Sequence, residues 1–196
     1  MISPCQSSES TLFLFIVQRP VCIVISLIFG RESTVRMNRF HIQHTCRFLT
    51  YHLLRPHASG HGIHSPFVYR LTRDLLRRQG RCARTGGTLA GRLAAWYGCD
   101  RTVPWSGSPE TGSPSTCYTA DATVLPPDGP FFHEKDIVVL QHIRRDETTC
   151  SNWQQWKQPP GVTVTIDLWH SGIIFFDRRL HRQDFTIYAS KALVAH

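Results

Sequence analysis

Three histidines lie close together in a glycine-containing segment: His57, His61 and His64. Imidazole nitrogens bind zinc and other divalent ions, so this group of residues is a candidate metal site. No cysteine accompanies them, and the run HASGHGIHSP has the glycine and proline content of a loop rather than a helical register that would align the rings. We therefore interpret the three histidines as exposed turn residues and expect no metal site.

Arginines are concentrated between Arg70 and Arg101, where eight of them accompany two acidic residues. Guanidinium groups contact phosphates, and a formal net charge of +8 favours an anionic partner. Within this stretch, Trp96 and Tyr97 are the aromatic residues that could stack on bases. Nucleic-acid binding through the Arg70–Arg101 cluster is therefore one interpretation, and a solvated helix face is the other.

The seven cysteines are scattered, with no two closer than 17 residues. This spacing excludes CxxC metal and redox motifs, and the odd number argues against a disulfide framework. We expect a reducing, cytoplasmic compartment. With 196 residues, 41% hydrophobic and 18% charged, the chain is long enough for one domain with a sizeable core and too apolar to be wholly disordered.

The apolar run over residues 12–29 is interrupted by Gln18, Arg19 and Pro20. An arginine near the centre of a membrane span costs roughly 2.5–3.5 kcal/mol on insertion scales, which disfavours a transmembrane anchor. A poor anchor and a buried strand pair are the alternatives. We expect Met37 to be the true start, residues 1–36 to be an upstream or poorly structured extension, and a membrane not to be a partner.

Two helices are predicted in the N-terminal half of the remaining chain. Apolar residues recur at roughly helical spacing over 38–54, and Pro56 ends that pattern. The stretch 66–79 reads as a second amphipathic helix. Ser65 can cap its start, and Pro66 suits the first helical position, where a missing N–H is tolerated.

A buried strand, a helix and a hairpin are predicted in the C-terminal third. Residues 136–140 read DIVVL, which is typical of a buried parallel strand, and the following segment spaces Trp153 and Trp156 on one helix face. Two β-rich runs over 162–176 flank a His-Ser-Gly turn and predict an antiparallel hairpin, and 183–188 can add an edge strand. This order is typical of the end of a doubly wound α/β sheet.

Five segments at the two ends of the domain are informative together: HSPFVY at 64–69, IVVLQHIRR at 137–145, WQQW at 153–156, VTVTIDLW at 162–169 and GIIFF at 172–176. In this order they resemble small bacterial class I methyltransferases that depend on S-adenosylmethionine. The run GTLAGRLAAWYG at 87–98 is similar to the helix before that family's first strand. The resemblance covers residues 38–100 and 134–188, and it implies a Rossmann-like sheet, bound S-adenosylmethionine and methyl transfer.

The middle of the chain departs from that family. The resemblance implies a first strand that leads into a glycine loop, and a further acid that holds the ribose of the cofactor. Residues 102–133 are instead rich in proline, serine and glycine, and 25 positions lead from Gly112 to Ile137. Each βαβ unit takes roughly 30 residues. We therefore expect an irregular linker over 102–133 and an incomplete sheet within a single domain of residues 37–196.

The resemblance also nominates site residues. Gly107, Glu110 and Gly112 are candidates for the cofactor loop, and Asp121 is the candidate for the ribose acid. His142 is the candidate general base, since it follows the buried strand next to which substrate should sit. The predicted function is methyl transfer from S-adenosylmethionine to an unknown acceptor, in a domain whose short middle puts activity in doubt. A non-catalytic basic module that binds nucleic acid and a non-functional gene remnant are the alternatives.

Overall fold

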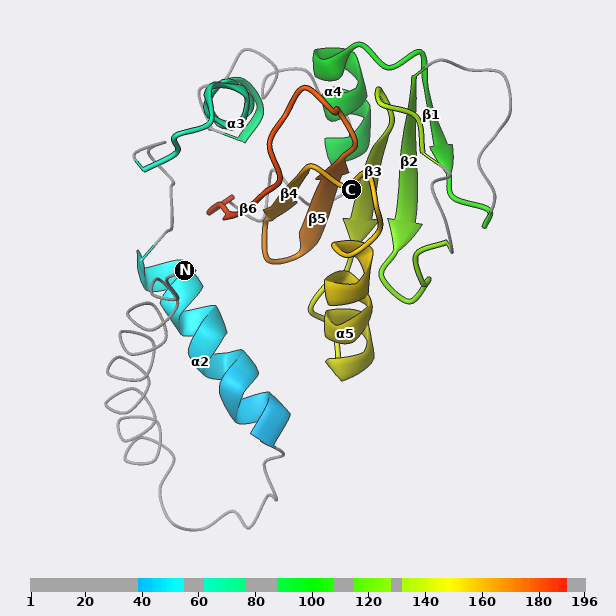
Figure 1. Cartoon of the computed structure of the whole chain (residues 1–196). Coiled ribbons are helices and arrows are strands. Elements are labelled where there is room, and N and C mark those ends of the chain that lie inside the picture. Colours follow the sequence, from blue (N-terminus) through cyan, green and yellow to red (C-terminus); the bar gives the residue numbers. More distant parts are fainter. Residues whose placement is uncertain (1–38, 55–61, 77–87, 108–114, 128–131, 190–196) are drawn as a thin grey trace, which may run out of the picture. The chain divides into compact units, whose positions relative to one another are not determined.

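The computed structural model describes residues 39–54, 62–76, 88–107, 115–127 and 132–189 (Figure 1). The chain divides into two compact units, residues 1–54 and 55–196, each of which is described by itself. The first unit contains helix α2, Arg39–Leu54, which confirms the helix predicted over 38–54. The extension expected over 1–36 lies outside the described residues. Among the described helices, none has the length and apolar character needed to cross a bilayer.

Helix α3, Pro66–Leu71, begins at the predicted residue. The Val68 N–H donates to Oγ of Ser65 at 3.4 Å, and the proline occupies the first helical position. The helix continues as one π-helical turn, η1, Thr72–Leu76. Its apolar face is buried, as the amphipathic pattern predicted. The helix expected over 66–79 is thus confirmed as far as its described residues extend.

Helix α4, Leu89–Tyr97, precedes the first strand of the sheet. The hydroxyl of Thr88 accepts a hydrogen bond from the Gly91 N–H at 3.1 Å and so caps the helix. Gly98 ends the helix in the left-handed conformation, with φ of 84°, which glycine adopts without strain. Strand β1, Arg101–Pro104, follows after a short turn.

The expectation of an irregular segment over 102–133 is corrected by the structure. The segment contains most of β1 and the whole of β2, Thr116–Asp121. Strand β1 pairs in parallel with β2, and β2 pairs in parallel with β3, Ile137–Gln141. Neither strand has an apolar run, and β1 is an edge strand that ends in Pro104, where a missing N–H is tolerated. Pairing with a neighbour therefore outweighs local propensity here.

The predicted order of the C-terminal third is confirmed. Strand β3 is followed by helix α5, Glu147–Trp156, and then by the antiparallel hairpin of β4, Val164–Asp167, and β5, Ser171–Phe175. Strand β6, Gln183–Thr186, pairs in parallel with β4 and forms the edge strand expected over 183–188.

The six strands form one mixed sheet in the order β1-β2-β3-β5-β4-β6. Strand β5 is antiparallel to both of its neighbours, and every other pairing is parallel. The carboxyl ends of β1, β2, β3 and β4 therefore lie at one edge of the sheet; Figure 1 shows the arrowheads of the first three there. An α/β fold with a C-terminal hairpin is thus confirmed.

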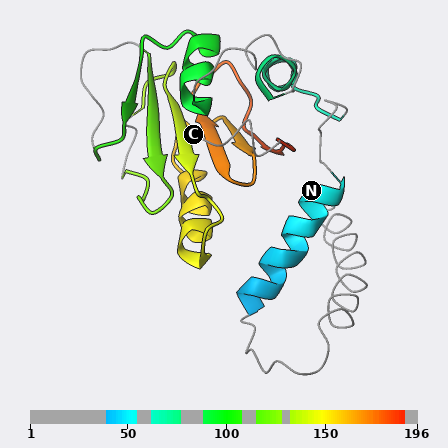
Figure 2. The same ribbon diagram turned by 180° about the vertical axis from the view of Figure 1, so that it is seen from behind.

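Alternate residues of β3 face two separate layers of the core. Ile137 and Val139 pack with buried residues of α3, η1 and α4, which cover one face of the sheet. Val138 and Leu140 pack with Trp153 and other residues on the opposite face, where α5 lies. In Figure 2, α4 lies in front of the strands. Burial on both faces explains why this strand reads as a continuous apolar run.

Candidate functional site

Two of the predicted site residues, Asp121 and His142, meet at the carboxyl edge of the sheet. Asp121 is the last residue of β2, and His142 directly follows β3. The Nδ1 atom of His142 lies 2.8 Å from Oδ2 of Asp121. The side chain of His142 is 49% exposed and that of Asp121 is 36% exposed, so a molecule bound at this edge can reach both.

Backbone geometry brings the imidazole to the end of the neighbouring strand. The register pairs Asp121 with Gln141, and the Ala122 N–H donates to the Gln141 carbonyl at 2.9 Å. His142 has a φ of 57°, a left-handed conformation that costs a residue with a Cβ roughly 1–2 kcal/mol. Such conformations cluster at functional sites, where the surrounding structure holds them in place.

The contacts of Asp121 favour its ionised form. Burial raises the pKa of Asp121, but hydrogen bonds from His142 and from Thr123, whose N–H lies 3.0 Å away, outweigh burial and lower it below its ordinary value. The Arg145 guanidinium, 3.6 Å from the carboxylate, acts in the same direction. A carboxylate only accepts hydrogen bonds, so Nδ1 of His142 carries the shared proton. A ring with its proton on Nδ1 has a lone pair on Nε2, which points away from the carboxylate and can accept a hydrogen bond.

Gly107 lies just beyond β1, at the same edge of the sheet. Its φ of 94° is left-handed, and a Cβ at this position would meet no atom of the described residues within 4 Å. The glycine backbone is therefore open to a ligand. The Trp105 N–H donates to the Thr119 carbonyl at 2.8 Å, which holds the chain beside β2 as it leaves the sheet. The other two loop candidates, Glu110 and Gly112, lie outside the described residues.

A second acid lies at this edge, Asp167, the last residue of β4, and no role was assigned to it from the sequence. Its side chain is 4% exposed and accepts a hydrogen bond from Arg144. It also accepts hydrogen bonds from Nε1 of Trp153 at 3.3 Å and from the Trp169 N–H at 2.9 Å. The Arg144 guanidinium lies over the Trp169 ring, 4.7 Å from its centroid. The available signal was the apolar run VTVTI ending in an acid.

The loop after β3 reaches both acids with residues two positions apart. His142 contacts Asp121 at the end of β2, and Arg144 contacts Asp167 at the end of β4. Ile143 between them is buried, and its N–H donates to a carbonyl of the turn between β4 and β5 at 3.3 Å. The loop is therefore anchored at its centre, and it places an imidazole and a guanidinium at one sheet edge.

Two other sequence predictions are only partly covered by the structure. Within the described ranges, no three His, Cys, Asp or Glu side chains come together as a metal site would require. His64 is described, whereas His57 and His61 are outside those ranges. Residues 77–87 are also outside them, so nucleic-acid binding by the Arg70–Arg101 cluster stays a prediction.

Comparison of the chain with protein-family models, with curated proteins and with solved structures finds no match.

Proposed function

We propose that the chain is a Rossmann-like, class I type of methyltransferase that transfers a methyl group from S-adenosylmethionine to a nucleophilic acceptor. The observation that carries this proposal is the contact between Asp121 and His142 at the carboxyl ends of two parallel strands. Ligands of open α/β sheets bind at that edge. Strand β5, reversed between β3 and β4, agrees with the terminal hairpin that the sequence resemblance implies.

The residues at this edge fit the cofactor. At Gly107, after β1, no atom of the described residues lies where a Cβ would point, so a ligand can approach the backbone of this residue. Asp121 accepts hydrogen bonds from His142 and Thr123, and an ionised carboxylate has further lone pairs that can accept a ribose hydroxyl. Gly107 and Asp121 would therefore hold the cofactor, which supplies a methyl group activated by a positively charged sulfur.

His142 acts as the general base on the acceptor. Asp121 fixes the tautomer by taking the Nδ1 hydrogen bond, which leaves Nε2 to remove a proton from the attacking hydroxyl, amine or thiol. The ionised carboxylate also stabilises the imidazolium that forms. Asp121 thus has two roles in this proposal, as the ribose acid that the resemblance implies and as the residue that positions His142.

Methyl transfer by the full chain tests the proposal. S-adenosylmethionine labelled in its methyl group is offered with alcohol, amine and thiol acceptors. We expect labelling of at least one class, reduced by about 10²–10⁴-fold in His142→Gln, since that is the usual contribution of a general base. His133→Gln, at an exposed histidine outside the site, serves as the matched control and should retain the wild-type rate. A folded chain that labels no acceptor would overturn the proposal. So would a rate of acceptor labelling that is the same in His142→Gln as in wild type.

A further inference from the structure

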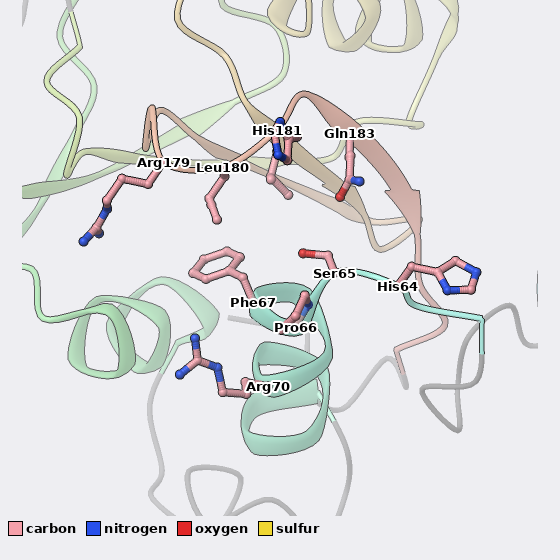
Figure 3. Close-up of a pocket in the computed structure, with 10 residues that line it drawn as sticks. His64, Ser65, Pro66, Phe67, Arg70, Arg179, Leu180, His181 and Gln183 are labelled. Atoms are coloured by element: carbon pink, nitrogen blue, oxygen red, sulfur yellow. The ribbon is translucent and has the colours of Figure 1, made fainter.

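A pocket lies at the amino end of β4, away from the end that carries Asp167. Its volume is about 330 Å³. Its walls come from α3 and the residues just before it, from Val164 at the start of β4, and from the segment that leads into β6 as far as Gln183 (Figure 3). Because β4 runs parallel to β2 and β3 in the sheet, this pocket is at the opposite sheet edge from the Asp121–His142 pair.

Two arginines line this pocket, and one of them, Arg179, is ion-paired with Asp177. Arg70 extends from α3 and Arg179 from the segment before β6, and both line the pocket (Figure 3). His64 and His181 also line the pocket, and none of the ten lining residues is acidic. Guanidinium groups bind planar and tetrahedral oxyanions through paired N–H donors, so two of them beside one pocket favour an anionic ligand.

Asp177 holds the Arg179 guanidinium in place at this pocket. Nε of Arg179 donates to Oδ1 of Asp177 at 2.9 Å, and Nη2 donates to Oδ2 at 2.7 Å. The arginine side chain is 81% exposed while that of Asp177 is 6% exposed, so the guanidinium remains accessible from solvent. A positioned arginine loses less rotamer freedom when a ligand binds, which favours affinity.

One wall of the pocket is apolar. Phe67 packs edge-on against Trp96 and Phe175, with ring centroids 5.6 Å and 5.0 Å away. Leu180 also lines the pocket, and Figure 3 shows it pointing toward the Phe67 ring. A ligand that fills this space therefore needs an apolar part next to its anionic group, because the apolar wall gains from being shielded from water.

We propose that this pocket binds a phosphate monoester of an aromatic or aliphatic alcohol. The phosphate contacts Arg70 and Arg179, and the organic group packs against Phe67 and Leu180. A phosphate monoester carries a charge of about −1.5 to −2 at neutral pH and three acceptor oxygens, which suits two guanidiniums better than a carboxylate does. The volume lies within the range of small-molecule sites, about 300–1,000 Å³. This binding is independent of methyl transfer at the other edge.

Calorimetric titration of the full chain with phenyl phosphate at low ionic strength tests the proposal. We expect saturable binding that is at least tenfold tighter than that of benzoate or inorganic phosphate. Arg70→Gln should weaken phenyl phosphate binding at least tenfold. Arg73→Gln is the matched control, because it removes the same charge from the adjacent turn but from a residue that does not line the pocket. The affinity of Arg73→Gln for phenyl phosphate should stay within about twofold of the wild-type affinity.

Several outcomes would overturn this site. Equal weakening by Arg70→Gln and Arg73→Gln would indicate diffuse attraction by a basic protein, and no saturable binding would exclude the pocket altogether. Benzoate binding as tight as that of phenyl phosphate would contradict the preference for a dianion. Leu180→Ala should weaken the binding of phenyl phosphate and leave the binding of inorganic phosphate unchanged. The reverse pattern would contradict the apolar contact between Leu180 and the organic group. Unchanged thermal unfolding of each variant verifies that the fold persists.

Discussion

His142 and Asp121 are 21 positions apart in the chain, yet they share a hydrogen bond of 2.8 Å across the ends of two neighbouring parallel strands. The contact exists because β2 and β3 are paired in register and because the chain turns at His142 in a left-handed conformation. An ionised carboxylate thereby selects one tautomer of an accessible imidazole. That is the arrangement a general base requires.

The tautomer of His142 is the first testable consequence. In nitrogen-15 NMR spectra, the wild-type ring should carry its proton on Nδ1, because Asp121 accepts from that atom. Asp121→Ala removes the acceptor, and the ring should shift toward the Nε2–H form. Glu147→Ala, at an exposed acid shortly after His142, is the control and should leave the tautomer as it is. An unchanged His142 signal in Asp121→Ala would mean that this carboxylate does not orient the ring.

Gly172 should not accept even a methyl group. A Cβ at this position would lie 2.5–2.9 Å from ring carbons of Trp153, inside the buried core. We expect Gly172→Ala to lower the free energy of unfolding by about 1–3 kcal/mol, the usual cost of overpacking. Gly91 lies in helix α4, and a Cβ added there would lie 3.4 Å from its nearest neighbour, Oγ1 of Thr88. Gly91→Ala should therefore leave the free energy of unfolding unchanged or raise it by up to about 1 kcal/mol. Chemical denaturation measures both, and equal stabilities of the two variants would contradict this packing.

The fold could be predicted from the sequence where segments carry their own signal. IVVL, VTVTI and GIIFF are β-branched and apolar, and Ser65 with Pro66 marks a helix start, so strand β3, the β4–β5 hairpin and α3 were predictable. Strands β1 and β2 read RTVP and TCYTAD. Their pairing depends on β3, a neighbour that comes later in the chain, which no local pattern reveals.

Two residues of the site could be predicted from the sequence, but the contact between them could not. The sequence pointed to Asp121 and His142 separately, one as a ribose acid and the other as a base. Their contact depends on strand register and on an unusual backbone conformation at a residue that is not glycine. Asp167 had no assigned role, although an acid at the end of an apolar strand is a signal that could have identified it.

Asn152 should stabilise the turn that follows Asp121. Its Nδ2 donates to the carbonyls of Ala122 at 2.9 Å and Thr123 at 3.2 Å, which ties helix α5 to that turn. Asn152→Ala leaves these acceptors without the side-chain donor and should lower the free energy of unfolding by about 1–3 kcal/mol. Gln155→Ala, an exposed amide on the same helix, should change it by less than about 0.5 kcal/mol. Equal effects of the two substitutions would contradict a specific role for Asn152.

Asp177 should make stability depend on pH in the acid range. Hydrogen bonds from Arg179 outweigh burial and lower the pKa of Asp177 below its ordinary value of 3.8. A carboxyl whose pKa is lowered by folding stabilises the protein fully above the unfolded-state value, and that stabilisation is lost as the pH falls through the folded-state value. Wild type should therefore be more stable than Asp177→Asn near neutral pH, and the difference should shrink below pH 3.8. A stability difference between wild type and Asp177→Asn that stays constant as the pH falls would contradict a lowered pKa of Asp177.

Calorimetric titration of the full chain with S-adenosylmethionine is the decisive measurement for a cofactor site at the carboxyl ends of the strands. We expect saturable binding with micromolar affinity, weakened at least tenfold by Asp121→Ala and unchanged by Arg70→Gln, which alters the opposite edge of the sheet. No binding by a chain that unfolds cooperatively would contradict a cofactor site at the carboxyl edge. Equal weakening by the two substitutions would contradict it as well.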